Sequence, residues 1–320
     1  MCSAAGQSFP PVDPDSPSSK SEETYFSASL AGSSLQSDPP ELVDVAEEES
    51  YIREWITLQW RPNDPIYLYV VRPRGVAKPP VVIYVPDYPA ETDAFRDDKW
   101  CQRVTTGGFA AAAFVPALNG HRYHGRPMKE WFVSELQEAL SKSAHDVQMV
   151  ETYLGQRGDL DMSRVGIRGE GAGATIAALA ASVDARIKAV DLVDPWGDWP
   201  TWMKFSDVVP EDERPAFLKP QFLKRVEAFD PVVVLRRINA EHVRLVQFGQ
   251  GSSTPELSRR TMAEALPASA EQRRFATSAE FERGDESSGA GQGWIKRSLK
   301  PERAASANAM RQAGSRSESR

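Results

Sequence analysis

The sequence predicts a doubly wound α/β domain with a mostly parallel sheet. Three observations support this fold class. Short apolar runs that suit strands alternate along the chain with segments that suit helices. Several of these runs are continuously apolar, as in parallel strands that are buried on both faces. The chain has 320 residues, of which 41% are hydrophobic, so it can bury a sizeable core.

The two ends of the chain differ in composition from its middle. Residues 1–49 are rich in Ser, Pro, Asp and Glu, whereas residues 285–320 are rich in Ser, Gly, Ala and Arg. Both ends lack strand or helix periodicity, so we expect a disordered acidic leader, a folded domain over residues 50–284 and a disordered basic tail. Within the tail, residues 294–300 combine apolar side chains with bases and suit a surface or partner contact.

The first half of the domain predicts four strands and one long helix. Residues 55–60 and 66–72 suit an opening pair of strands, joined by a loop rich in Pro, Asn and Asp. Residues 81–85 and 109–115 are continuous apolar runs, each followed by proline, and suit central strands. Residues 131–157 predict a helix, because one apolar stripe recurs at steps of three and four: Leu136, Leu140, Ala144, Val147, Val150 and Leu154.

The second half continues the same alternation. Residues 165–167 suit a buried strand that leads into a glycine-rich turn and then into a helix of small residues over 174–180. A strand over residues 187–193 is followed by an insertion rich in Trp, Pro and charged residues, at about 196–240, which predicts a small cap. The remaining elements are a strand over 243–248, a helix over 255–266 and a strand near 273–277.

The glycine-rich turn is the most specific motif. It reads Gly169-Glu170-Gly171-Ala172-Gly173 and lies between a strand and a helix, which is the context of a nucleophile elbow. In an elbow the central residue has a strained backbone, and the flanking glycines let strand and helix approach closely. A phosphate-binding loop is the alternative, but no Lys-Ser/Thr pair follows the glycines.

Residues 161–173 resemble the elbow of the α/β-hydrolase superfamily. The similarity is greatest to the dienelactone hydrolase, acetyl xylan esterase and prolyl oligopeptidase-like branches, and it extends over about residues 50–280. The resemblance implies an α/β-hydrolase type of sheet with a small cap insertion. It also implies a catalytic serine, acid and histidine.

The sequence lacks all three triad residues where the resemblance places them. The nucleophile position is Gly171, which has no side chain to attack a carbonyl. The acid is expected after the strand at 243–248, where no carboxylate occurs before Glu256. The histidine is expected beyond about residue 277, but all four histidines come earlier: His121, His124, His145 and His242. The triad is therefore degenerate.

The predicted oxyanion hole is also altered. The superfamily commonly has His-Gly after the strand that residues 81–85 match, whereas this chain has Pro86-Asp87. Proline has no backbone N–H to donate, and a carboxylate beside a developing oxyanion would raise its energy. Glu170 could act as an acid or base, but we expect its side chain to point away from the site. We expect Cys101 to be a core residue of a helix.

Ligand-binding candidates follow the strands at the carboxyl edge of the predicted sheet: Tyr88, His121, Arg122, His124, Asp194, Trp196 and Trp199. The histidines and Arg122 could bind an anion or a metal, although exposed loop histidines need no ligand. Without a third ligand they predict no metal site. Asp194 either orients a ligand or forms a turn before Pro195. The tryptophans, with Trp202, either line a binding surface or seal the cap.

These observations predict a non-catalytic hydrolase homologue that binds a small ligand or a protein partner and needs no cofactor. The alternative is an active esterase or peptidase with a displaced nucleophile such as Ser252 or Ser253. The net charge of −7 gives no basic face for nucleic acid. The sequence has no apolar run long enough to span a membrane.

The number of cysteines and the first residues of the sequence indicate in which cellular compartment the protein is expected. Two cysteines and no recognisable signal peptide favour the cytoplasm. Met1-Cys2-Ser3 would suit a lipoprotein start if a longer signal preceded it.

Overall fold

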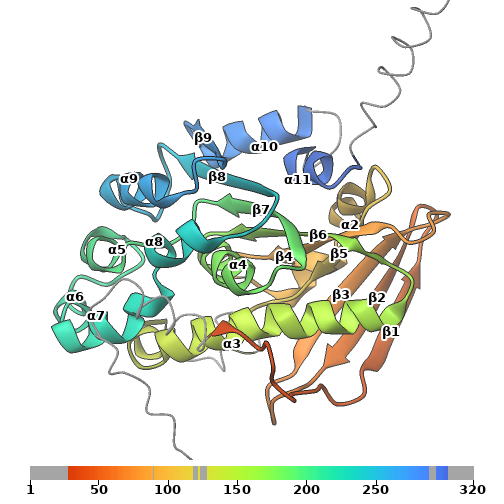
Figure 1. The fold of residues 1–320 in the computed structure, drawn as a ribbon, viewed down its shortest axis with the longest axis horizontal. Coiled ribbons are helices and arrows are strands. Elements are labelled where there is room, and N and C mark those ends of the chain that lie inside the picture. The colour runs from red at the N-terminus through yellow and green to blue at the C-terminus, as the bar shows by residue number, and fades with distance from the viewer. Residues whose placement is uncertain (1–27, 89, 118–121, 123–127, 288–292, 302–320) are drawn as a thin grey trace, which may run out of the picture.

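The computed structural model describes residues 28–88, 90–117, 122, 128–287 and 293–301, apart from some side chains of the long helix and of residues 285–287. Within these residues the chain forms one sheet of nine strands in the order β1-β2-β3-β5-β4-β6-β7-β8-β9 (Figure 1). The strands are β1 (Glu41–Glu47), β2 (Tyr51–Leu58), β3 (Ile66–Pro73), β4 (Pro80–Val85), β5 (Ala110–Ala113), β6 (Asp161–Glu170), β7 (Ile187–Val193), β8 (His242–Phe248) and β9 (Glu271–Phe275).

The sheet is antiparallel at one side and parallel through the rest. β1, β2, β3 and β5 pair antiparallel in turn. β5, β4, β6, β7, β8 and β9 pair in parallel. This order confirms the predicted doubly wound, mostly parallel α/β fold.

Helices cover both faces of the sheet (Figure 1). The helices of the main domain are α2 (Asp98–Thr105), α3 (Met128–Arg157), α4 (Ala172–Val183), α9 (Glu256–Ala265), α10 (Ser278–Ser287) and α11 (Gly293–Ser298), with a 3₁₀ turn at Thr92–Arg96. The cap contains α5 (Trp199–Phe205), α6 (Arg214–Phe217), α7 (Pro220–Val226) and α8 (Pro231–Val234), with 3₁₀ turns at Glu227–Phe229 and Leu235–Arg237.

The central strands are buried on both faces, as their continuous apolar sequences predict. In β4, Val81, Ile83 and Val85 face a core shared with α3, α4 and the cap. Val82 and Tyr84 face a second core, shared with α2 and α11. Since successive side chains of a strand point to opposite faces, this run of apolar residues supplies both cores.

The structure differs from the sequence prediction at the beginning of the domain. Part of the expected leader is ordered, because β1 pairs with β2 and the buried Ala28 reaches the main core. β1 is an edge strand with exposed acidic residues among its apolar ones. Its order comes from backbone pairing with β2, which the composition of residues 1–49 does not reveal.

The structure also differs at the end of the domain, where α11 lies within the expected tail. A Cβ atom at Gly166 of β6 would lie 2.9 Å from Leu299 and 3.1 Å from Ile295, so this segment packs directly on the sheet. The buried Lys296 donates to the Arg103 and Thr106 carbonyl oxygens at 2.8 and 3.0 Å. The apolar and basic residues at 294–300 thus contact the domain itself. A segment this short carries too little periodicity to predict its packing.

Among the described residues, no helix combines the length and the apolar character needed to cross a membrane.

Candidate functional site

The turn between β6 and α4 has the backbone of the predicted elbow. β6 ends at Glu170 and α4 begins at Ala172, so Gly171 makes the turn with φ 53° and ψ −118°. A Cβ atom at Gly169 would lie 2.3 Å from the Gly173 carbonyl oxygen. One at Gly173 would lie 2.2 Å from the Val85 carbonyl oxygen. Glycine is therefore required on both sides of the turn, where strand and helix approach most closely.

The Asp87 carboxylate fills the space beside Gly171. β4 ends two residues before Asp87, at the same end of the sheet as the elbow. A Cβ atom built on Gly171 would lie 1.9 Å from both Cγ and Oδ1 of Asp87. No real Cβ atom comes this close to a non-bonded atom. A side chain at residue 171 is therefore incompatible with the observed position of the Asp87 carboxylate.

Two backbone amides hold the Asp87 carboxylate in this position. Its Oδ1 accepts hydrogen bonds from Ala172 N at 2.7 Å and from Tyr88 N at 2.8 Å. Two convergent amides, one of them from the residue after the nucleophile, form the donor set of an oxyanion hole. Here both amides bond to an acceptor from the same chain. From the sequence, the oxyanion-hole position after β4 is expected at Pro86 and Asp87. In the structure, the amide that donates there is that of the next residue, Tyr88.

Burial raises the pKa of Asp87 to about 6. Loss of hydration is the largest cause, and the nearby carboxylates of Glu170 and Asp194 act in the same direction. The two amides lower the pKa because they bond to the charged form. The group is thus mostly ionised at neutral pH and becomes neutral in mild acid.

Asp194 brings a second buried carboxyl group to this end of the sheet. It follows β7 with φ 51°, a backbone region in which Asp is tolerated, as the turn interpretation requires. Its Oδ1 accepts from Phe248 N at 3.4 Å. Burial raises the pKa of Asp194, while a hydrogen bond with Ser252 lowers it. Its ligand-orienting role stays a prediction.

The loop after β8 holds the serines of the alternative mechanism. Ser252 Oγ donates to the Thr254 carbonyl oxygen at 3.1 Å and accepts from Thr254 N at 3.0 Å. The Ser253 carbonyl oxygen accepts from Ser206 Oγ at 2.6 Å. Farther on, Glu256 pairs with Arg274 and Arg259, and their hydrogen bonds lower its pKa to about 2. Glu256 is therefore part of an ion-pair cluster at the start of α9.

The structure describes two of the four histidines. The His145 ring contacts Trp60 with centroids 5.9 Å apart, and His242 is exposed at the start of β8, at the other end of that strand from the serine loop. His121 and His124 lie outside the described residues.

Arg122 is engaged in a buried ion-pair network. Its Nε and Nη1 contact Asp64 and Asp146 at 2.8 and 2.6 Å, and Arg61 contacts the same two carboxylates. Arg122 is buried. Because Asp64 lies in the loop between β2 and β3 and Asp146 lies in α3, the network joins this loop to the helix. The anion-binding role expected for Arg122 would require it to leave these two partners.

The cap tryptophans lie in the core. Trp196, Trp199 and Trp202 are 2%, 1% and 0% exposed. The Trp196 and Trp202 rings stack with centroids 4.8 Å apart. The buried Asp230 carboxylate accepts from the amides of Asp198 and Trp199 at 2.8 and 2.7 Å, which fixes the start of α5. This burial favours the interpretation that the tryptophans seal the cap.

The two remaining candidates have structural partners. Glu170 is exposed and pairs with Arg168 at 3.2 Å. Cys101 is buried in α2 and belongs to the core beneath that helix, as expected. In the described part of the chain, no group of three or more His, Cys, Asp and Glu side chains is arranged to hold a metal.

Comparisons with known proteins identify the fold. No protein-family model and no curated protein sequence match the chain. Among solved structures, acetyl xylan esterase 1 from Thermoanaerobacterium sp. matches with a TM-score of 0.65 and 11% identity, over 93% of this chain and 92% of its own. The acetyl xylan esterase from Paenibacillus sp. matches with a TM-score of 0.61 and 18% identity, over 79% and 85%.

A third match is 2,6-dihydroxy-pseudo-oxynicotine hydrolase, with a TM-score of 0.53 and 16% identity over 88% of this chain and 73% of its own. The TM-scores support a shared fold, and identities of 11–18% leave the reaction open. The chain therefore has the α/β-hydrolase fold that its elbow motif predicted.

Proposed function

We propose that this chain does not catalyse serine-type acyl transfer and acts as a non-catalytic binding module on the hydrolase fold. One observation carries the proposal. The Asp87 carboxylate lies where a nucleophile at residue 171 would project, and it takes the amides that would hold a substrate oxyanion. The site thus lacks both the attacking group and free donors for a tetrahedral intermediate.

The charge of the site supports the same proposal. At neutral pH Asp87 is mostly ionised, and the carboxylates of Glu170 and Asp194 are close enough to raise its pKa. A developing oxyanion would have to displace one negative charge and form near two others. This arrangement opposes the charge that acyl transfer creates.

Ester hydrolysis by a displaced serine is the alternative function. It is the activity for which the two matching acetyl xylan esterases are named. The position of Ser252 beside the buried Asp194 carboxylate favours it, since a carboxylate can accept a hydroxyl proton. Asp194 would then act without an intervening histidine.

Purified full-length chain, incubated with p-nitrophenyl acetate and with a fluorophosphonate probe at pH 7.5, tests the proposal. We expect hydrolysis at the rate of buffer alone and no labelling of the folded protein. Ser252→Ala and its neighbour Ser253→Ala form a matched pair of variants. Turnover above the buffer rate that is lost in Ser252→Ala and kept in Ser253→Ala would establish the alternative.

The proposed ligand is a small molecule or a protein, and the cytoplasm is the proposed compartment. Two cysteines form no disulfide framework, and the described Cys101 is a buried thiol.

A further inference from the structure

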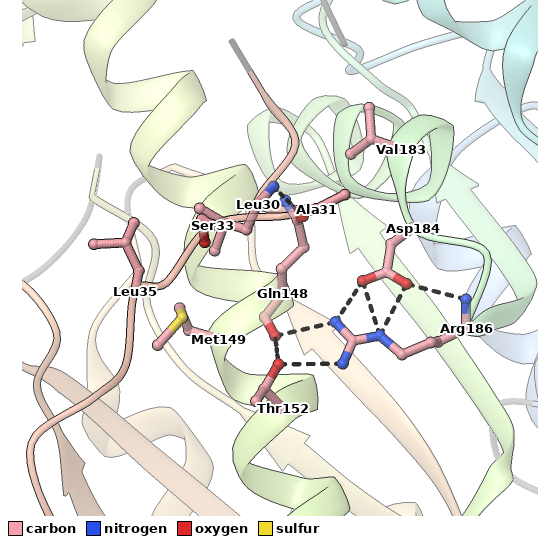
Figure 2. A pocket seen from close by; sticks show the side chains of 10 residues that line it. All are labelled: Leu30, Ala31, Ser33, Leu35, Gln148, Met149, Thr152, Val183, Asp184 and Arg186. Carbon is pink, nitrogen blue, oxygen red and sulfur yellow. Dashed lines mark hydrogen bonds and ion pairs between the residues drawn. The ribbon is translucent and has the colours of Figure 1, made fainter. Parts of the chain in front are cut away.

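A pocket of about 320 Å³ opens at the end of the sheet opposite the elbow. It lies between α3, the end of α4 and residues 28–35, which we call the strap (Figure 2). Its lining residues are Leu30, Ala31, Ser33, Leu35, Gln148, Met149, Thr152, Val183, Asp184 and Arg186. Asp184 and Arg186 lie just before β7, whereas Gly171 lies just after β6, so the two regions flank opposite ends of parallel strands. Small-ligand sites begin at about this volume.

The strap is held in place by one side chain of α3. Gln148 Oε1 accepts from Leu30 N at 2.8 Å, and Gln148 Nε2 donates to the Ala28 carbonyl oxygen at 2.6 Å. The amide side chain thus bonds to the strap as a neighbouring strand would. With the strap fixed in this way, Leu30 and Leu35 form one wall of a preformed pocket.

The opposite wall is polar and is held by hydrogen bonds of Arg186. The Arg186 guanidinium pairs with the Asp184 carboxylate at 2.6 Å and donates from Nη1 to Thr152 Oγ1 at 3.1 Å. Its Nη2 also donates to the Gln148 carbonyl oxygen at 3.3 Å. Figure 2 shows Arg186 stretched across the pocket from Asp184 toward Thr152, with Leu35 and Met149 on the other side.

One donor of Arg186 has no acceptor in the described part of the chain. A guanidinium has five N–H groups. Nε and Nη2 bond to Asp184 and the Gln148 carbonyl oxygen, while Nη1 bonds to Thr152 alone and keeps a second N–H. The Arg186 side chain is 46% exposed, so a ligand can reach it.

The residues that line the pocket carry no net charge. The lining contains one cation, Arg186, and one anion, Asp184, which neutralise each other. Behind them the fully buried Glu151 lies 3.5 Å from Arg186 Nη2, and burial raises its pKa well above the usual range. Apolar residues form most of the remaining lining. A charged ligand would lose hydration on entering the pocket, and the lining offers no net opposite charge to compensate for this loss.

We propose that this pocket binds a small uncharged amphipathic molecule. A hydrogen-bond acceptor of the ligand, such as a carbonyl oxygen, takes the second Nη1–H of Arg186. The apolar part of the ligand lies against Leu30, Leu35 and Met149. The site is separate from the elbow, and it gives the binding module proposed above a location and a ligand class.

Three probes of equal chain length test the ligand class: hexanamide, hexanoate and hexylammonium. The full chain, labelled with ¹³C at the methionine methyl groups, is titrated with each probe at pH 7.5, and Met149→Leu assigns the Met149 signal. We expect hexanamide to shift this signal and to bind at least fivefold more tightly than either charged probe. A stronger response to a charged probe, or no shift up to the solubility limit, overturns the proposal.

Two exposed leucines form a matched pair of variants. Leu35 is 51% exposed in the pocket and Leu257 is 48% exposed on α9. Leu35→Asp should raise the Kd for hexanamide at least tenfold, because it removes an apolar wall, whereas Leu257→Asp should change it less than twofold. Equal effects of the two variants would overturn the site assignment.

Arg186→Lys separates hydrogen bonding from charge. It keeps the positive charge and removes the planar Nη1 donor, so the Kd for hexanamide should rise while the preference over the charged probes is kept. An unchanged Kd for hexanamide would overturn the role of Arg186. Measurement of p-nitrophenyl acetate turnover in the same samples keeps the two proposals apart: turnover contradicts the non-catalytic function, and absent binding contradicts the pocket.

Discussion

The two ends of the central sheet differ in what fills them. At the carboxyl end, the space beside Gly171 is taken by the Asp87 carboxylate, which bonds to Ala172 N and Tyr88 N. At the amino end, a pocket of about 320 Å³ remains open beneath the strap. Ligands of open α/β sheets usually bind at the carboxyl end. In this chain the Asp87 carboxylate takes the space beside the elbow, and a pocket lies at the opposite end of the sheet.

The two ends of the sheet also differ in the kind of contact that determines their structure. The elbow depends on backbone atoms that approach too closely for any Cβ at Gly169 or Gly173. The pocket depends on side chains, chiefly Gln148 and Arg186. The elbow should therefore be sensitive to added volume, and the pocket to the removal of a hydrogen-bonding group.

The largest effect is expected from a side chain at the elbow. Gly171→Ser places a Cβ at 1.9 Å from Asp87, so the carboxylate must leave its two amides. Overpacking of this kind costs about 2–4 kcal/mol of unfolding free energy, measured by urea denaturation. Ester hydrolysis should still be absent, since the sequence has no histidine after residue 242, where the resemblance places the base.

Two variants check that prediction. In Gly171→Ser combined with Asp87→Gly, the obstacle is gone, so the two changes should together destabilise less than their sum. Gly155→Ser is the matched control, because a Cβ at Gly155 meets nothing within 4 Å. If Gly171→Ser were as stable as Gly155→Ser, the Asp87 carboxylate would not occupy the elbow.

A smaller and pH-dependent effect is expected from Asp87→Asn. The folded chain raises the pKa of Asp87 from 3.8 to about 6, so folding favours the protonated group. The resulting stabilisation is complete below about pH 4 and is lost as the pH rises through 6. Relative to Asp87→Asn, the unaltered chain should lose about 1–2 kcal/mol of stability between pH 4.5 and 7.5, allowing for partial exposure. A difference that stays constant over this range would contradict the burial of the charge.

The smallest effect is expected at the pocket. Gln148→Ala removes both hydrogen bonds to the strap, at Leu30 N and the Ala28 carbonyl oxygen. The strap can open to water, so the loss should be local, about 1 kcal/mol, and visible as faster hydrogen exchange of the Leu30 amide. Gln272→Ala, which removes one exposed hydrogen bond to the Ala263 carbonyl oxygen, is the control and should leave that exchange rate unchanged.

The central elements could be predicted because their sequence patterns are local and strong. The apolar run at residues 81–85 became β4, the three- and four-residue stripe became α3, and the predicted strand at 187–193 is β7 with the same bounds. The glycines of the elbow were predicted because close approach admits no other residue. The edge strand β1 and the short helix α11 were missed, since their order depends on distant partners, β2 for one and Gly166 for the other.

The candidate site was predicted only in part. The sequence showed that Gly171 and Asp87 depart from the hydrolase pattern at the nucleophile and the oxyanion hole. The two residues are 84 positions apart, so no local pattern indicates that the Asp87 carboxylate fills the space of the missing side chain. The sequence also offered Arg122 as a ligand group, whereas the structure pairs it with Asp64 and Asp146. The pocket beneath the strap had no sequence signal, because its residues come from three separated segments.

The sequence by itself determined the fold class and the elbow, because hydrophobic periodicity and obligatory glycines are properties of neighbouring residues. It also determined that position 171 carries no nucleophile. Tertiary structure alone decided what stands in the nucleophile's place and where a cavity opens. Both depend on atoms from distant segments that meet only when strands and helices pack, as Asp87 meets Ala172 and the strap meets Gln148.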